Sequence, residues 1–271
     1  MNSELNIVFI GCGNIAKAMV KGIVKSKIMP CKNICIYDRH YEKTADLSAE
    51  MNVSAAKELG EVLHALKKAD FVFVCVKPDA LKKAADQIKD SIKEGAVIVS
   101  PAAGVSVEKL NEYFESSNTV RIMPNIAISV MRGITMICEN ESIDVEKMDS
   151  LKKVISSFGD IWVGNEKHVD AFTALAGSSP AMIFMLIEAM ADAAVYLGIK
   201  RSDAYNIAAK AVEGSAGMLI ESQSHPAVLK DGVCSPSGTT IEMCAVLENE
   251  SFRSAVMKAI IACADKCKKL G

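Results

Sequence analysis

The sequence lacks any apolar run that approaches the roughly 20 residues needed to span a membrane as a helix. It carries little net charge, −2 at pH 7, which gives no general attraction to nucleic acid or to anionic membrane surfaces. The N-terminal residues MNSELN lead directly into the first predicted strand and leave no room for a signal peptide. These absences predict a cytoplasmic protein that binds neither nucleic acid nor membrane.

The residue pattern of a metal site is also missing. The four histidines are scattered, and the nine cysteines contain no Cys-x-x-Cys pair. A zinc site needs closely spaced cysteines backed by histidines. We therefore predict no metal ion, and we interpret the cysteines as reduced thiols that act as small apolar side chains.

The side chains of ordinary acid–base catalysis are scarce. The second half of the chain contains only His168 and His225, and His225 precedes Pro226 at a predicted helix start, where we expect a structural role. No Ser/His/Asp arrangement stands out, nor any lysine in an apolar helix. This favours a reaction that needs no strong protein base, such as hydride transfer from a bound cofactor to an electrophilic carbon.

The most informative feature that is present is a glycine-rich turn near the N-terminus. An apolar, β-rich segment at 6–10 runs into Gly11-Cys12-Gly13, and apolar residues at helical spacing follow over 14–25. Such a turn lets the backbone approach a phosphate, which then faces the positive end of the helix. We predict a dinucleotide site here; a turn that only packs the helix on the strand is the alternative.

The end of the second predicted strand, 33–37, carries residues that favour different dinucleotides. Asp38, 25 residues after Gly13, could hydrogen-bond the adenosine ribose of NAD. Arg39, helped by Lys43, could instead bind the 2′-phosphate of NADP, because a guanidinium offers two parallel donors to phosphate oxygens. We expect NADPH, with NADH possible; an ordinary solvated helix start would also explain Arg39 and Lys43.

Strands and helices alternate through about the first 160 residues. Further strands are predicted at 71–76, 96–100, 119–123, 134–138 and 161–163. Helices are predicted at 80–92, capped by Asp79 after Pro78, and at 145–158. This alternation is typical of a doubly wound parallel sheet, whose ligand lies at the carboxyl ends of the strands. The turns at 77–78 and 101–104 should therefore flank the cofactor.

After about residue 164 no strand-like segment remains, and long helices with many small residues take over. They are predicted at 169–177, 180–197, 201–222, 241–248 and 252–270. Much of their surface is too apolar to be solvated, so we expect part of it to contact a second subunit; a tight monomeric bundle is the alternative. The predicted fold is α/β, with a Rossmann-type doubly wound domain (1–163) and an all-helical dimerisation domain (164–271).

One irregular segment, 230–241, interrupts these helices and brings glycines and hydroxyl groups to a helix start. Its backbone amides, with the hydroxyls of Ser235, Thr239 and Thr240, form a natural cradle for a carboxylate. A threonine that only caps the helix would look the same. The turn at 177–180 places Ser178 at another helix start, where a structural cap competes with substrate binding.

Over essentially its whole length the chain resembles the pyrroline-5-carboxylate reductase family. The resemblance rests on motifs in both halves: IGCGNIA (10–16), VKP (76–78), AAGV (102–105), RIMPN (121–125), GSSPA (177–181), EAMAD (188–192), HPxxLKD (225–231) and CSPSGTTI (234–241). It implies a Rossmann domain, then a helical domain that interlocks two subunits into a homodimer, with dimers often assembled into decamers. It also implies reduction of 1-pyrroline-5-carboxylate to L-proline with NADPH or NADH.

The resemblance further implies roles for individual residues. The cofactor-binding residues that it implies are Ile10, Gly11, Cys12, Gly13, Asn14, Ile15, Val76, Lys77, Pro78, Ala102 and Ala103. Asp38 and Arg39, argued above from the end of the second predicted strand, complete the expected cofactor site. The expected substrate-binding residues are Ser235, Gly238, Thr239, Thr240 and, from the other hydroxyl-bearing turn, Ser178. Thr240 is the expected catalytic residue and hydrogen-bonds near the imine nitrogen. An iminium carbon accepts hydride readily, so a carboxylate cradle and a well-placed nicotinamide suffice.

Some positions depart from the usual pattern of the family. Ser179 and Ser237 stand where glycine is frequent and add side chains beside the expected substrate turns. Asp38 stands where Asn or Ser commonly precedes Arg. Two alternatives therefore stay open: a reductase of a related cyclic imine or small acid, and a non-catalytic NAD(P)-binding regulator of the same fold.

Overall fold

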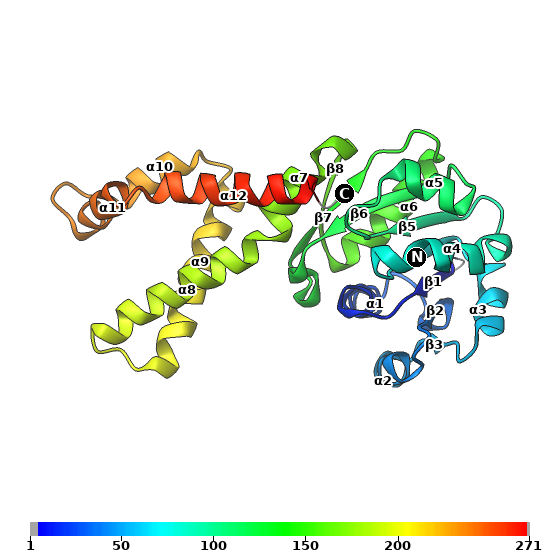
Figure 1. Ribbon diagram of the computed structural model, residues 1–271. Helices are drawn as coiled ribbons and strands as arrows, with labels where there is room; N and C mark the ends of the chain where they lie inside the picture. The colour runs from blue at the N-terminus through cyan, green and yellow to red at the C-terminus, as the bar shows by residue number, and fades with distance from the viewer. Residues whose placement is uncertain (1–4, 270–271) are drawn as a thin grey trace. The chain divides into compact units, whose positions relative to one another are not determined.

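The structure is a computed structural model that describes residues 5–269. Within these residues the first part of the chain forms one eight-stranded sheet in the order β3-β2-β1-β4-β5-β6-β7-β8 (Figure 1). Only β6 and β7 pair antiparallel. The strands are β1 (Ile7–Ile10), β2 (Ile34–Tyr37), β3 (Ser54–Ala55), β4 (Phe71–Val74), β5 (Val97–Ser100), β6 (Thr119–Pro124), β7 (Gly133–Cys138) and β8 (Gly159–Gly164). The predicted α/β class is confirmed.

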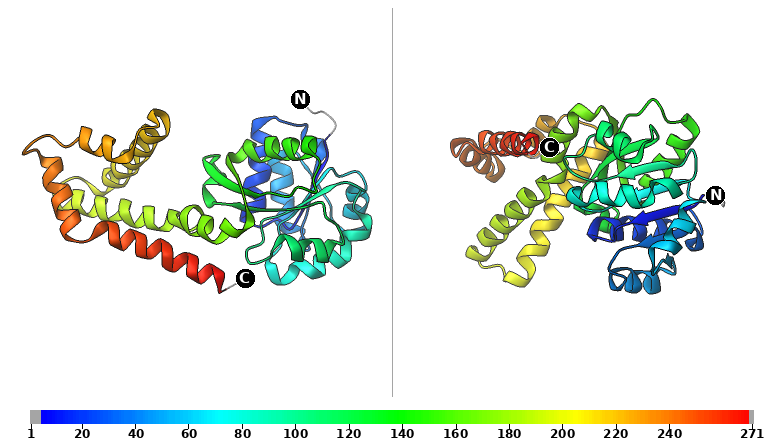
Figure 2. Two further views of the ribbon diagram at one scale, coloured as in Figure 1. Left: turned by 90° about the horizontal axis from the view of Figure 1, so that it is seen from above. Right: turned by 45° about the vertical axis from the view of Figure 1, so that its right-hand side comes forward.

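Helices cover both faces of this sheet (Figure 2). They are α1 (Asn14–Ser26), α2 (Glu42–Met51), α3 (Leu59–Leu66), α4 (Pro78–Ile88), α5 (Val107–Phe114) and α6 (Val145–Ile155). Alternate residues of β1 enter different cores: Phe9 packs with α1, α2 and α6, whereas Val8 and Ile10 pack with α3, α4 and α5. Because β1, β4 and β5 are buried on both faces, they are continuous apolar runs in the sequence.

The order of the strands reverses between β1 and β4. From β1 the chain adds β2 and β3 on one side, and it then returns to place β4, β5 and β6 on the other. The register pairs Ile10 with Val74 and Phe73 with Val99, so the loops after β1, β4 and β5 leave the same edge of the sheet. This reversal point is where doubly wound sheets bind their ligands.

The chain divides into two compact units, one running to Gly177 and including the residues from Ala264 on, the other Ser178–Cys263. The helices of the second half are α7 (Val169–Phe172), a π-helical turn (Thr173–Gly177), α8 (Ser179–Tyr196), α9 (Arg201–Ser222), α10 (Pro226–Gly232), α11 (Thr239–Asn249) and α12 (Phe252–Lys268). β8 ends at Gly164, next to the predicted boundary, and the division into 1–163 and 164–271 stays a prediction.

Several predicted helix bounds are wrong. The helix predicted at 80–92 begins at Pro78 with Lys77 as its N-cap, so Asp79 lies in the first turn and does not cap it. The helix predicted at 241–248 begins at Thr239. The helix start predicted at His225–Pro226 is present and opens α10, whose extent was not predicted. The Nδ1 atom of His225 accepts the Ala227 amide at 3.2 Å, which confirms a structural role.

The surface of the helical half is strongly apolar. The fully buried residues of α8 and α9 are Ala191, Ala204 and Ala208, whereas large side chains such as Phe184 and Ile220 are exposed. The stretch Glu166–Tyr196 is long and apolar enough to cross a membrane by length and composition alone, so the prediction that no such segment exists is wrong by that measure. Apolar surface of this extent calls for a partner.

Candidate functional site

Gly11 occupies a position that a larger residue does not fit. Its φ is +90°, and a Cβ atom there would lie 2.8 Å from the carbonyl oxygen of Cys75 and 2.9 Å from its carbonyl carbon. The backbone is held from both sides, because Gly11 N–H donates to Tyr37 O (2.8 Å) and Cys75 N–H donates to Ile10 O (2.7 Å). The first glycine of the motif therefore closes the loop onto the neighbouring strands.

Gly13 is in the opposite situation. It is the N-cap of α1 with an ordinary φ of −76°, and a Cβ atom there would meet no described atom within 4 Å. In the described part of the chain no side chain caps this helix, and its first turn has no acidic residue. The first amides of α1 therefore have no capping partner, and no side chain at Gly13 blocks the approach to them. This arrangement fits the pyrophosphate of a dinucleotide.

Asp38, at the end of β2, braces the glycine loop. Its Oδ2 accepts the Cys12 amide at 2.9 Å, and its Oδ1 accepts the His40 amide at 3.0 Å. The Nζ atom of Lys43 lies 3.8 Å from the same carboxylate. Arg39 is exposed, and within residues 5–269 no ion pair engages its guanidinium. Of the charged residues at this strand end, Arg39 is therefore the one available to a ligand.

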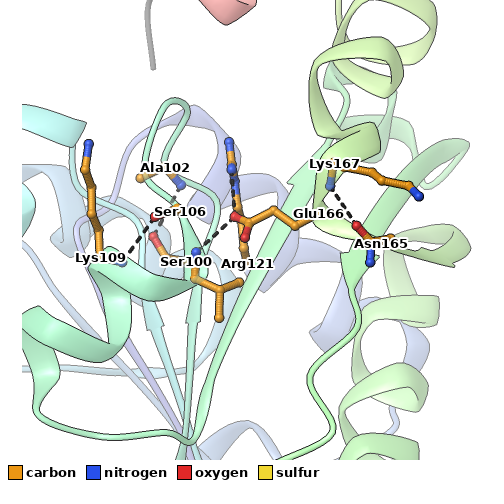
Figure 3. A network of polar contacts seen from close by, with 9 residues as sticks. Ser100, Ala102, Ser106, Lys109, Arg121, Asn165, Glu166 and Lys167 are labelled. Atoms are coloured by element: carbon orange, nitrogen blue, oxygen red, sulfur yellow. Dashed lines mark hydrogen bonds and ion pairs between the residues drawn. The ribbon is translucent and has the colours of Figure 1, made fainter.

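The loops after β4 and β5 complete this edge. Ser100 Oγ accepts the Ala102 amide at 3.3 Å (Figure 3). The same hydroxyl donates to Val74 O at 3.4 Å, which ties the second loop to the first. Ala102 is buried, whereas Ala103 and Lys77 are exposed. The predicted cofactor residues thus lie on loops that follow four neighbouring strands, β2, β1, β4 and β5.

The thiols in these loops are shielded from solvent. Burial raises the pKa of Cys12 above its usual range, and burial likewise raises the pKa of Cys75. Both therefore rest as neutral thiols, and neither forms a disulfide. Among residues 5–269 no cluster of three or more His, Cys, Asp or Glu side chains could hold a metal ion.

A partly buried ion pair, which no pattern in the sequence predicts, lies beside the second loop. Arg121 on β6 is 8% exposed, and its Nη1 donates to Glu166 Oε1 at 2.9 Å (Figure 3). The same oxygen accepts the Val107 amide at the start of α5 (2.9 Å). The only feature of the sequence that could have indicated this pair is the single arginine within the apolar segment 119–123. The pair fixes the start of α5, and with it the end of the loop that carries Ala102.

Asn125 makes a second link at the end of β6. Its Oδ1 accepts the Ile134 amide, and its Nδ2 donates to Ala176 O, each at 3.2 Å. Ala176 belongs to the π-helical turn Thr173–Gly177, which replaces the last part of the helix predicted at 169–177. π-Helical turns are frequent at functional sites. Asn125 thus holds the turn that leads directly into Ser178.

The segment before α11 folds into a tight turn. Ser235 O accepts the Gly238 amide at 3.0 Å, Pro236 follows Ser235, and Ser237 has a φ of +57°. A Cβ atom on Gly238 would lie 2.2 Å from Ser235 Oγ, so a side chain at this position would require the Ser235 hydroxyl to rotate away. Because the Gly238 amide is used inside the turn, amides for a carboxylate come from the residues that follow it.

Those residues open α11. Gly238 is the N-cap, and among the described residues no side chain caps this helix, so the alternative of a capping threonine is wrong. Thr239 and Thr240 lie in the first turn, where helix amides have no partner within the helix. Ser178 is the N-cap residue of α8. It is exposed, and its side chain makes no capping hydrogen bond in the described structure. Both helix starts leave hydroxyl groups available to a ligand.

Comparison with known proteins agrees with this arrangement. The family model for pyrroline-5-carboxylate reductase dimerisation matches residues 166–270, and the model for NADP oxidoreductase, coenzyme F420-dependent, matches 6–104. The pyrroline-5-carboxylate reductase of Escherichia coli is 39% identical over 268 residues, which are 98% of each chain. That of Arabidopsis thaliana is 34% identical over 98% of this chain and 96% of its own.

Solved structures give the same result. A pyrroline-5-carboxylate reductase from Coxiella burnetii matches with a TM-score of 0.92 at 29% identity, covering 99% of each chain. The Plasmodium falciparum pyrroline carboxylate reductase, solved with NADP bound, matches with a TM-score of 0.86 at 27% identity over 100% of each chain. The predicted resemblance is confirmed over the full length. The chain belongs to the pyrroline-5-carboxylate reductase family.

Proposed function

We propose that this chain reduces 1-pyrroline-5-carboxylate to L-proline, the last step of proline biosynthesis, with NADPH as the hydride donor. The observation that carries the choice of substrate is the start of α11. Its open amides follow a tight turn, and such a helix end suits the carboxylate of a small cyclic imine. The glycine loop at the reversal point of the sheet is the corresponding observation for the dinucleotide.

In the proposed mechanism the substrate is held by its carboxylate. The amides of Thr239 and Thr240 bind the carboxylate oxygens, and the hydroxyl of Ser235 adds a donor beside them. Ser178, at the start of α8, is a further proposed substrate-binding residue. The Thr240 hydroxyl hydrogen-bonds at the imine nitrogen and stabilises the proton there, which keeps the neighbouring carbon electrophilic. No protein base is required, which agrees with the scarcity of histidine in this half of the chain.

The proposed cofactor residues are those that the sequence predicts on four loops. The open amides from Gly13 to Ile15 hold the pyrophosphate, and Val76, Lys77, Pro78, Ala102 and Ala103 flank the rest of the dinucleotide. When bound, the nicotinamide supplies the hydride. Arg39 binds the 2′-phosphate, because Asp38 already accepts two backbone amides and lies beside Lys43. This arrangement supports NADPH over NADH.

The dimerisation domain gives a homodimer. We propose in addition that dimers assemble into decamers and that the enzyme is cytoplasmic, both from the resemblance to the family. Size-exclusion chromatography with light scattering tests the first, because a lone dimer and a decamer differ fivefold in mass. Fractionation of cells that express the chain tests the second.

The activity itself is tested by following oxidation of NADPH, and separately of NADH, in the presence of 1-pyrroline-5-carboxylate. Rapid oxidation with release of proline supports the proposal, and a higher rate with NADPH supports the role of Arg39. Turnover of another cyclic imine alone would favour a reductase with a different substrate. Tight binding of both dinucleotides without turnover of any imine would favour a regulator.

The choice of cofactor is tested by Arg39→Ala. Loss of a charge-assisted contact to phosphate is expected to raise the KM for NADPH about tenfold to a hundredfold and to leave the KM for NADH unchanged. Lys68→Ala, which removes an exposed cation elsewhere in the same unit, is the matched control. Equal effects of Arg39→Ala on both dinucleotides would contradict the assignment.

A further inference from the structure

Two cysteines of the helical half lie in contact beside the proposed substrate turn. The Sγ atoms of Cys234 and Cys244 are 3.9 Å apart, although the residues are ten positions apart in the chain. Both thiols are free and half-buried. Cys234 directly precedes Ser235 in irregular backbone, whereas Cys244 lies within α11. One thiol is therefore attached to the turn, and the other to the helix that the turn precedes.

A disulfide between them would enclose the whole proposed carboxylate site. The closed ring would contain the turn Ser235–Gly238 and the first turn of α11 with Thr240. Disulfide sulfurs are about 2.0 Å apart, so the two sulfurs must approach by about 2 Å. Because Cys244 is held in a regular helix, most of this movement falls on Cys234 and on Ser235, which follows it.

We propose that Cys234 and Cys244 form a reversible thiol–disulfide site that reacts with a low-molecular-weight disulfide such as oxidised glutathione, and that oxidation weakens substrate binding at the adjoining turn. The effect on binding rests on the function proposed above for Ser235–Thr240. The covalent site itself depends only on the contact between the two sulfurs.

The reaction proceeds by two exchanges. One protein thiolate attacks a sulfur of oxidised glutathione, which breaks the S–S bond, forms a mixed disulfide and releases one glutathione thiolate. The second protein thiolate then attacks the protein sulfur of the mixed disulfide and releases the other glutathione. The two protons of the protein thiols end on the two glutathione thiolates. Two protein thiols are oxidised to one disulfide, and one oxidised glutathione is reduced to two glutathiones.

The resting pair is expected to be stable as two thiols. Burial, together with the hydrogen bond to Cys244, raises the pKa of Cys234 above its usual range. Since only the thiolate exchanges, reaction at neutral pH should require an excess of oxidised glutathione. Reduced glutathione or dithiothreitol would restore the pair. These properties describe a site that responds to the ratio of oxidised to reduced thiols.

The test treats the full-length enzyme with oxidised glutathione and then makes two measurements on separate samples of it. Mass spectrometry of proteolytic peptides should find Cys234 joined to Cys244, with loss of two hydrogen atoms. Kinetics should find the KM for 1-pyrroline-5-carboxylate raised about tenfold, the loss of about one hydrogen bond to a charged group, with the Kd for NADPH unchanged. Dithiothreitol should reverse both changes.

Two variants separate this pair from the other cysteines. Cys244→Ser should keep the untreated activity and lose the response to oxidised glutathione, with Cys244→Ala as a second variant in case the first folds poorly. Cys263→Ser, a half-buried cysteine of the same unit, is the matched control and should keep the response.

Failure to form the Cys234–Cys244 disulfide in a large excess of oxidised glutathione would overturn the proposal, as would its formation with an unchanged KM. Absence of activity in the untreated enzyme would instead contradict the proposed function, and the mass measurement would still decide whether the covalent site exists.

Discussion

The two glycines of the N-terminal loop are predicted to fail in different ways when each is changed to alanine. At Gly13 the added methyl group meets no described atom within 4 Å, and the φ of −76° suits alanine. At Gly11 the methyl group would lie 2.8 Å from the backbone oxygen of Cys75, at a φ of +90°. Gly13→Ala should therefore fold normally and bind dinucleotide poorly, whereas Gly11→Ala should fold poorly.

The magnitudes follow from these contacts. For Gly11→Ala, about 1–2 kcal/mol for the positive φ adds to about 1–3 kcal/mol for overpacking against a backbone that cannot yield, a total of about 2–5 kcal/mol. In a chain of this size that lowers Tm by about 5–15 °C. For Gly13→Ala, the poorer N-cap costs about 0.5–1 kcal/mol, which the reduced freedom of the unfolded chain offsets by about the same amount. Its Tm should stay within about 2 °C of the parent.

The assay combines thermal unfolding with a binding titration of NADPH on both variants. Gly13→Ala should raise the Kd for NADPH at least about tenfold, because the methyl group stands where the backbone must approach the pyrophosphate. Parental affinity in a stable Gly13→Ala variant would refute the phosphate site at this loop. A Gly11→Ala variant as stable as the parent would refute the packing argument.

Three further changes test the other sites. Thr240→Ala is expected to lower kcat about 100-fold, as for loss of one donor at a reacting centre, and to leave the Kd for NADPH unchanged. Thr240→Ser should restore most of the rate. Equal losses of turnover and cofactor affinity, in steady-state and binding measurements, would contradict the role of Thr240. Ser237→Gly should raise the free energy of unfolding by about 0.5 kcal/mol, measured by urea titration, because glycine adopts a φ of +57° without strain. Glu166→Ala should lower the free energy of unfolding by about 3 kcal/mol in the same titration, since buried Arg121 loses its partner. Adding Arg121→Met should recover much of the loss. An unchanged free energy of unfolding in Glu166→Ala would show that the pair stabilises nothing.

Long elements with one strong pattern were predictable from the sequence. The three central strands β1, β4 and β5 are buried on both faces and therefore appear as unbroken apolar runs. α9 was predicted with both of its ends, Arg201 and Ser222, because its 22 residues contain several full turns. The glycine loop was placed correctly for a similar reason: its meaning depends on the strand before it and the helix after it, and both were visible.

What escaped prediction depends on contacts between distant residues or on very local geometry. The sequence placed Asp38 at the end of β2, but its use by the Cys12 amide requires residues 26 positions apart to meet. The start of α10 at Pro226 was predictable, but its extent was not, because seven residues are too few to show a helical periodicity. The π-helical turn at Thr173–Gly177 continues the apolar pattern of a helix, and only its hydrogen bonds distinguish it from α-helix. Arg121 pairs with Glu166, 45 residues later, which no local pattern indicates.

The scarcity of buried side chains in the helical half has a consequence for how the enzyme denatures. In α8 and α9 only alanines are fully buried among the described residues, and α10, α11 and α12 have no fully buried residue there. Most of the free energy that holds these helices must therefore come from association of the two chains. Their unfolding then obeys mass action, so dilution lowers the temperature at which they melt. The sheet has its own buried cores and melts at a temperature that dilution leaves nearly unchanged.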